Sequence, residues 1–313
     1  MAFDPIELSR ETEQIVIQGD KRKYNIFRLE RFYGQMATAR GVGCNLRCIP
    51  CWINPSRDSP AGYGTFYSPQ EVHEGTVRAA EGLYKIMSSG IRISGCEPTI
   101  GKSHLLSLIE LCQKEKKFKF FLLETNGILL GNDREYIKEL AEFKDYIVIR
   151  LSLKAGNPEG FEMRTGARAE FFELPFIALR NIKEAGIDYR VASMSADPAI
   201  MPPAERRDLL KRLVSSGENL SCLDEERTDL FESTKQRLSA AGVGIESVGK
   251  RVYCPLDIGL LRSSAEQAGL SLSVQQLLEM AILETVQSPC SKCKRENPWH
   301  GHGTRDDLDP RLG

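Results

Sequence analysis

Apolar and polar positions alternate in blocks along the middle of the chain, and these blocks predict its secondary structure. Short apolar runs predict strands at 36–42, where the residues are small, and at 91–94, 118–123, 146–153 and 189–194. Amphipathic stretches between and after these runs predict helices at 68–89, 103–116, 133–143, 169–185 and 204–214. Strands that alternate with helices over short connections predict a parallel sheet with the helices packed outside it.

The pattern is weaker toward the two ends of the chain. Residues 14–17 predict a short N-terminal strand, and residues 245–253 predict a sixth strand of the parallel sheet. Two further helices are predicted at 257–268 and 273–287. The intervening stretch 204–244 is helical and charged, and it carries no recognisable chemical motif.

Polar side chains with chemical capability recur where the predicted strands end. They are Cys44, Glu97, Asn126, Lys154 and Ser193. The carboxyl ends of parallel strands meet at one edge of a sheet, where ligands bind in α/β folds. We therefore expect these side chains to share one site. Ordinary loop polarity is the alternative, and it does not explain the cysteine.

Composition and charge narrow the class of protein. The chain has 313 residues and a formal net charge of −1. This length suits one large α/β domain, alone or with a small extension. The charge argues against a globally basic nucleic-acid binder. Basic and aromatic residues interleave over 21–33, which suits either RNA contact or packing on the body of the protein, so a nucleic-acid partner stays open.

Cysteine usage points to the compartment. Nine cysteines in a chain of this length are too sparse for a secreted disulfide scaffold, and their odd number favours a reducing compartment with metal ligation. The first 20 residues are charged and lack the apolar run of a signal peptide. No stretch approaches the ~18 apolar residues of a membrane span. We therefore expect a cytoplasmic protein with no membrane partner.

Three of the cysteines stand close together after the first predicted strand. Cys44, Cys48 and Cys51 have the spacing C-x3-C-x2-C. Soft thiolates this close on a short loop can converge on one metal centre. Three cysteines cannot all pair as disulfides, and zinc requires a fourth ligand that is not nearby. A 4Fe–4S cluster normally has four cysteine ligands, so three would leave one iron open to a small molecule. Three buried cysteines that happen to cluster are the alternative.

This spacing resembles the signature of the radical S-adenosylmethionine (SAM) superfamily. The resemblance implies that Cys44, Cys48 and Cys51 hold a 4Fe–4S cluster whose open iron binds the amino and carboxylate groups of SAM. It also implies reductive cleavage of SAM to methionine and a 5′-deoxyadenosyl radical, which abstracts hydrogen from a substrate. The family usually has an aromatic residue just before the third cysteine, near the adenine. Here Pro50 precedes that cysteine and Trp52 follows it.

Two further motifs at predicted strand ends resemble the same family. Residues 94–98, Ser-Gly-Cys-Glu-Pro, resemble its Gly-Gly-Glu-Pro motif, with Cys96 in place of the second glycine. The resemblance implies that Gly95 and Glu97 meet the amino group of SAM. Residues 125–127, Thr-Asn-Gly, resemble a motif found especially in the glycyl-radical activating enzymes. It implies a place for Asn126 near the ribose and methionine part of SAM.

The next strand and the loop after it also resemble that branch of the family. Ser152 and Lys154 alternate onto one face of the predicted strand, where they are expected to contact the ribose hydroxyls or the carboxylate of SAM. Arg164 is expected either to pair with that carboxylate as a bidentate fork or to be a solvated loop arginine.

The resemblance implies an α/β fold with a partial (β/α)6 TIM-like barrel and a small C-terminal extension that carries helices and cysteines. We expect an N-terminal extension at 1–34, the barrel at 35–255 and the C-terminal extension at 256–313. The implied activity is radical chemistry on an unidentified substrate, for which the activase-like motifs favour a polypeptide. A tRNA- or cofactor-precursor-modifying enzyme is one alternative. A non-catalytic iron–sulfur or zinc-binding interaction protein is another. The implied partners are SAM and an electron donor such as flavodoxin or ferredoxin.

A second metal site is predicted in the C-terminal part of the chain. Cys254 ends the predicted sixth strand, and Cys290 and Cys293 form a C-x2-C pair after the predicted helices. Three thiolates with His300 or His302 as a fourth ligand would suit zinc. Three thiolates alone would suit an auxiliary 4Fe–4S cluster. The remaining alternative is that these cysteines bind nothing.

Overall fold

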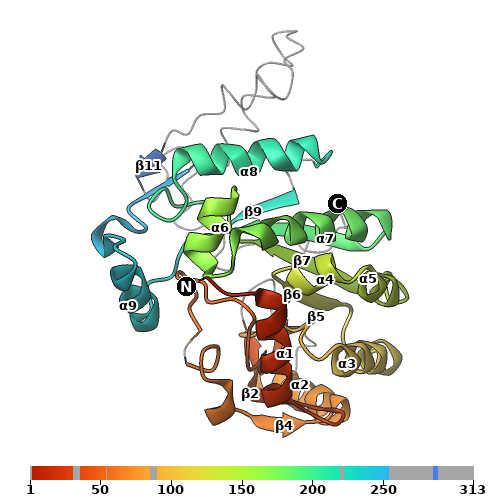
Figure 1. Ribbon diagram of the computed structural model, residues 1–313. Helices are drawn as coiled ribbons and strands as arrows, with labels where there is room; N and C mark the ends of the chain where they lie inside the picture. Colours follow the sequence, from red (N-terminus) through yellow and green to blue (C-terminus); the bar gives the residue numbers. More distant parts are fainter. Residues whose placement is uncertain are drawn as a thin grey trace.

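One mostly parallel sheet organises the protein (Figure 1). The computed structural model describes residues 2–30, 36–53, 55–84, 90–218, 222–253 and 285–287. Neighbouring strands run parallel in chain order: β3 (Met36–Gly41), β5 (Gly90–Ser94), β6 (Phe121–Thr125), β7 (Ile147–Leu153), β8 (Asp188–Ser193) and β9 (Leu223–Glu225). Within the described residues β9 pairs only with β8, so the sheet is an open partial barrel. The predicted α/β class is confirmed.

The opposite edge of the sheet is antiparallel and is built mainly by the N-terminal segment. β2 (Lys21–Glu30) pairs with β3, while β1 (Ile17–Gln18) and β4 (Thr65–Tyr67) both pair with β2. The Tyr24 ring is buried and stacks on Phe27 with 6.0 Å between ring centroids. These aromatics of the basic stretch therefore pack on the body of the protein, as one of the two sequence alternatives proposed.

Helices cover the outer face of this sheet in chain order (Figure 1). They are α2 (Pro69–Tyr84), α3 (Lys102–Glu115), α5 (Arg134–Ala141), α7 (Leu174–Glu184) and α8 (Pro203–Ser215). The other helical segments are α1 (Pro5–Val16), α4 (Ile128–Asn132), α6 (Pro158–Thr165), α9 (Glu232–Ala240) and the 3-10 turns η2 (Pro60–Gly62), η3 (Ala169–Glu173) and η5 (Ile245–Ser247). Among the described residues, no helix has both the length and the apolar character to cross a bilayer.

Local sequence sets where these helices begin. At α2 the Ser68 hydroxyl accepts a hydrogen bond from the Glu71 N–H at 3.3 Å, and the Glu71 carboxylate accepts one from the Ser68 N–H at 2.7 Å. This reciprocal pair is a capping box, which satisfies two backbone donors that the first helical turn leaves open. At α5 the Asp133 side chain accepts from the backbone N–H groups of Glu135 and Tyr136 in the same way.

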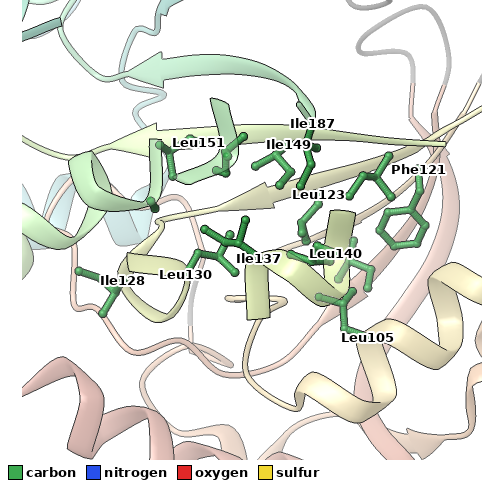
Figure 2. Close-up of a cluster of buried hydrophobic side chains, with 14 of the residues drawn as sticks. Leu105, Phe121, Leu123, Ile128, Leu130, Ile137, Leu140, Ile149, Leu151 and Ile187 are labelled. Carbon is green, nitrogen blue, oxygen red and sulfur yellow. The ribbon is translucent and has the colours of Figure 1, made fainter. Parts of the chain in front are cut away.

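The outer face of the strands is apolar and forms the main core with the helices. Figure 2 shows part of this cluster, in which Leu123 and Ile149 from the sheet lie beside Ile137 and Leu140 from α5 and Leu105 from α3. All five side chains are almost fully buried. Burying one such side chain contributes roughly 1.5–3 kcal/mol. The largest of the apolar clusters therefore lies on this face.

The inner face of the same strands has a different character, because successive side chains of a strand point to opposite faces. Near the amino ends of the strands, Met36, Phe120, Leu122 and Val148 form a small separate apolar cluster. One step further along the strands come charged side chains, and at the carboxyl ends come the polar residues singled out in the sequence. The interior of the partial barrel is thus layered from an apolar base to a polar rim.

The predicted strand at 14–17 is wrong for all but its last residue. Residues 14–16 form the last turn of α1, and only Ile17 enters a strand. The reason lies at the start of the helix: Pro5 occupies its first turn, and the Asp4 carboxylate accepts hydrogen bonds from the N–H groups of Ile6 and Glu7. A strong helix start thus overrides the β-branched run at its end.

The predicted sixth strand at 245–253 is also wrong. Residues 245–247 form the turn η5, and β10 (Arg251–Tyr253) pairs antiparallel with β11 (Thr285–Gln287) in a separate two-stranded sheet. The sixth parallel strand is β9, whose acidic sequence Leu-Asp-Glu hid it. β11 also contradicts the end of the helix predicted at 273–287. The rest of that helix, and the one at 257–268, lie outside the described residues.

Candidate functional site

A cavity of about 380 Å³ opens at the carboxyl ends of the parallel strands. Its lining includes most of the residues that the sequence singled out: Cys44, Cys48, Cys51, Gly95, Glu97, Asn126, Ser152 and Lys154. These residues come from four separate strand ends spread over more than a hundred positions of the chain. Parallel pairing of the strands brings them to one rim, as the sequence pattern predicted. Ser193, the fifth strand-end residue of that prediction, is fully buried and does not line the cavity.

The three cysteines lie on the loop that follows β3. This loop leaves the strand through Gly43, whose φ of 86° is in the left-handed region. A Cβ there would approach a Thr12 methyl to 2.6 Å, so only glycine lets α1 pack against the loop. Further along, the N–H of Cys51 donates to the carbonyl of Cys48 at 3.2 Å, which forms a turn that holds these two residues together.

Burial raises the pKa of the Cys44 and Cys48 thiols, and the neighbouring cysteines of the loop add to this rise. The charge of Lys154 acts on Cys48 in the opposite direction. Among the described residues, no three Cys, His, Asp or Glu side chains lie close enough together to hold one metal ion. A four-iron cluster does not need this, because each thiolate binds an iron of its own. Three soft donors on one cavity wall fit such a cluster.

Glu97 ties the strand ends together. One oxygen of its carboxylate accepts hydrogen bonds from the hydroxyls of Thr99 and Thr125, both at 2.7 Å. The other oxygen accepts from the backbone N–H of Asn126 at 2.8 Å, and the N–H of Glu97 itself donates to the Gly43 carbonyl at 2.9 Å. The loop after β3 and the ends of β5 and β6 are therefore joined through one buried residue.

Two asparagines link the cysteine loop to the end of β6. The Asn126 amide donates to the Asn45 side-chain oxygen at 2.7 Å, and its own oxygen accepts from the N–H of Ile128 at 3.0 Å. Asn45 is fully buried, and its amide nitrogen has no hydrogen-bond partner among the described residues. A buried donor without a partner is costly. Asn45 lies between Cys44 and Leu46, which both line the cavity, but it is not itself part of the lining. Sequence reasoning missed Asn45, although it lies between the first two cysteines.

Ser152 and Lys154 lie together at the end of β7, as their alternation predicted. The Lys154 ammonium donates to the Ser152 hydroxyl at 2.6 Å, and both side chains face the cavity. An ammonium beside a hydroxyl on the rim of a cavity can bind an anionic group such as a carboxylate.

Arg164 does not join the other predicted residues at the cavity. Its guanidinium donates to the carbonyls of Lys154, at 2.9 Å, and of Ile200, and it forms an ion pair with Glu205. Only 5% of its side chain is exposed, so it is not a solvated loop arginine either. The structure places it behind Lys154, where it holds the backbone of that residue.

The middle layer of the barrel interior is an ion-pair network below the rim. Arg92 contacts Glu124 at 3.3 Å, and Arg150 contacts Glu226 at 2.8 Å, Asp224 at 3.5 Å and Glu124 at 3.7 Å. Burial raises the pKa of Asp224 to about 6, although the nearby arginines lower it. Sequence reasoning missed this network. Its signal was a single arginine inside each of two apolar runs, at 92 and 150.

An aromatic pair lies on the cavity lining beside the third cysteine. The ring centroids of Trp52 and Phe231 are 6.4 Å apart, and the Arg40 guanidinium carbon lies 4.6 Å from the centroid of the Trp52 ring. Both aromatic side chains are partly exposed. Pro50, which stands before the third cysteine, also lines the cavity. The predicted second metal site involves Cys254, Cys290 and Cys293, which lie outside the residues that the structure describes.

The chain is similar in sequence and in fold to known proteins. Residues 39–202 match the family described as the Radical SAM superfamily. No curated protein matches the chain. Among solved structures, native anSMEcpe with bound AdoMet is 23% identical, with a TM-score of 0.43, and the match covers 56% of this chain and 46% of that one.

Two other solved structures match at lower identity. Streptococcus suis SuiB bound to S-adenosylmethionine is 18% identical, with 59% of this chain and 36% of that chain covered and a TM-score of 0.40. A mutant of spore photoproduct lyase is 12% identical, with 72% and 70% covered and a TM-score of 0.47. The chain spans less than half the length of the anSMEcpe and SuiB chains in these matches.

Proposed function

The chain belongs to the radical SAM superfamily, and on that premise we propose that it is an enzyme that cleaves SAM reductively. Cys44, Cys48 and Cys51 would hold a 4Fe–4S cluster, which supplies the electron that converts SAM to methionine and a 5′-deoxyadenosyl radical. The observation that carries the proposal is the convergence of four separately spaced motifs on one cavity rim. A scattered set of polar loop residues would not be expected to meet in this way.

The chain's own residues would bind and orient SAM. The Lys154 ammonium would pair with the SAM carboxylate, and the Ser152 hydroxyl beside it would bind the same group or a ribose hydroxyl. Asn45 would help to position Asn126 through the hydrogen bond between their side chains. Glu97 would contribute to SAM binding through its hydrogen bonds, because they fix the strand ends that carry Gly95 and Asn126.

The substrate would lie further inside the barrel, on the ion-pair layer. Glu124 and Glu226 are 20% and 26% exposed there, whereas Arg92 and Arg150 beneath them are 8% and 4% exposed. Carboxylates with free acceptor positions suit a substrate rich in N–H or O–H donors. A polypeptide would meet this requirement, and the activase-like motifs favour it. A tRNA or a cofactor precursor is the alternative substrate class. The electron would come from a protein such as flavodoxin or ferredoxin.

The proposal predicts a cluster that depends on the three cysteines. Anaerobically reconstituted full chain should bind iron and sulfide and, with SAM and dithionite, release 5′-deoxyadenosine, which chromatography detects. Replacement of Cys44, Cys48 and Cys51 by Ala should remove about four irons per chain, one cluster's worth, and abolish this release. Cys222→Ala is the matched control, because that cysteine does not line the cavity.

Two outcomes would count against the proposal. Iron content that the triple replacement leaves unchanged would show that these cysteines hold no cluster. A full iron content without any release of 5′-deoxyadenosine would favour the non-catalytic iron–sulfur protein instead.

A further inference from the structure

Three arginines surround the cysteine loop, and each donates a hydrogen bond to the backbone carbonyl of a different cysteine. The pairs are Arg47 with Cys44 at 2.7 Å, Arg57 with Cys48 at 2.6 Å, and Arg237 with Cys51. Arg237 also donates to the carbonyl of Ile53 at 2.6 Å. The backbone beside every cysteine of the motif is thus held by a cation.

One carboxylate joins the three arginines. Asp58 accepts two hydrogen bonds from Arg57, at 2.8 and 2.9 Å, and it forms ion pairs with Arg47 at 3.4 Å and Arg237 at 3.6 Å. The three arginines and Asp58 together carry a net charge of +2, counted without Lys154 and Glu97, which also lie near cysteines of the loop. Arg57 and Arg237 are the more buried members, with 5% and 17% of their side chains exposed, so water screens their charges least.

Asp58 lies between the two more buried arginines. Its carboxylate contacts Arg57 at 2.8 Å and Arg237 at 3.6 Å, so it offsets part of the positive charge that the two guanidinium groups place beside the loop.

Arg237 comes from a part of the chain that the family match does not reach. It lies on α9, whereas the match ends at residue 202. The Thr234 hydroxyl of the same helix also donates to the Cys51 carbonyl, at 3.3 Å. Figure 1 shows α9 well apart from the helices that cover the outer face of the sheet. Through Thr234 and Arg237, α9 binds backbone carbonyls of the cysteine loop and helps to hold that loop in place.

Reduction adds one electron to an iron–sulfur cluster, and fixed positive charge nearby stabilises the reduced form. We propose that Arg57 and Arg237 are positioning residues that raise the reduction potential of the cluster on Cys44, Cys48 and Cys51, and that Asp58 limits this rise. The inference rests on the proposed function, because it requires that cluster. A clamp that only held the loop in place would not depend on the sign of the charges.

Charge variants of the reconstituted full chain separate these roles. The measurement is a dithionite redox titration in which one electron passes from the reductant to the cluster, followed by the paramagnetic resonance signal of the reduced form. Arg237→Gln should lower the potential, and Asp58→Asn should raise it. Each change should alter the equilibrium constant of reduction on the order of tenfold, which corresponds to ~59 mV for one electron.

Two further variants serve as controls. Arg237→Lys keeps the charge and should leave the potential closer to the unmodified value than Arg237→Gln does. Arg134→Gln removes an exposed arginine of α5 that pairs with Glu184, and it should not move the potential. Shifts of the same sign in Arg237→Gln and Asp58→Asn, or no shift in either, would overturn the inference while the cluster itself stands. Failure of the unmodified chain to assemble any cluster would instead overturn the proposed function.

Discussion

The two faces of strand β7 show how one sheet serves two purposes. Ile149 and Leu151 point outward into the apolar core, whereas Arg150 and Ser152 point inward to the ion-pair layer and the cavity rim. The outward residues stabilise the fold simply by leaving water. The inward residues are also buried, but each charged one among them requires a specific partner. Stability on the outer face therefore depends on shape and area, and on the inner face it depends on charge balance.

The largest expected effect comes from removing the cation at the centre of the inner face. Arg150→Met removes the cation that Asp224 and Glu226 share, and within the described residues the buried Asp224 keeps only the charge of Arg190 nearby. Breaking a buried ion pair from one side typically costs ~3–5 kcal/mol, so the free energy of unfolding in urea at pH 7 should fall by about that amount. Arg134→Met is the control, because its exposed pair with Glu184 is worth ~1 kcal/mol or less. Equal losses of unfolding free energy in both variants would mean that the buried ion-pair network stabilises the fold no more than an exposed ion pair does.

A smaller effect should appear as a pH dependence. Burial raises the pKa of Asp224 from its ordinary 3.8 to about 6, so the folded protein keeps this proton over a range where the unfolded chain has released it. The contribution of Asp224 to native stability should therefore fall as the pH rises from about 4 to 6. Asp224→Asn removes this titration and should retain up to ~3 kcal/mol more of its stability across that window, at ~1.4 kcal/mol per pKa unit. Urea unfolding at several pH values measures it, and parallel pH profiles would refute it.

The smallest effect belongs to a conservative change on the outer face. Ile149→Val removes one methylene group from the core of Figure 2 and should cost about 1 kcal/mol, mostly from the lost burial. Urea unfolding should show an unchanged slope, and the iron content after reconstitution should stay the same. If this variant lost more stability than Arg150→Met, the proposed division between the two faces would be wrong.

This division also explains which elements the sequence could predict. Strands β3 and β5 to β8 carry apolar residues on the outer face, so their runs stand out between amphipathic helices. β9 is short and acidic. Its Asp224 and Glu225 can be buried in the sheet because Arg150 and Arg206, from elsewhere in the chain, balance their charges. No local pattern contains that information. Residues 14–16 are a different case, because Asp4 and Pro5 form a local helix-start signal that the prediction from the β-branched run at 15–17 left out of account.

The candidate site was predictable to a similar extent. The cysteine spacing and the strand-end motifs are local, and parallel pairing brings them together at one rim. The position of Arg164 could not be predicted, because its ion pair with Glu205 joins α6 to α8, which are distant in sequence. Arg237 could not be found, since 186 residues separate it from the carbonyl that it binds. Long-range contacts of this kind need the three-dimensional fold.

The distance between the cysteine loop and α9 has a consequence for biosynthesis. Cys51 leaves the ribosome 186 residues before Arg237 does. At the usual 5–20 residues per second, the loop then exists for about 10 to 40 seconds without its last anchor. During this interval only two of the three arginines, Arg47 and Arg57, have been synthesised and can bind the carbonyls of the cysteine loop. Assembly of the proposed cluster on the loop would accordingly meet a more accessible site during translation than after the chain is complete.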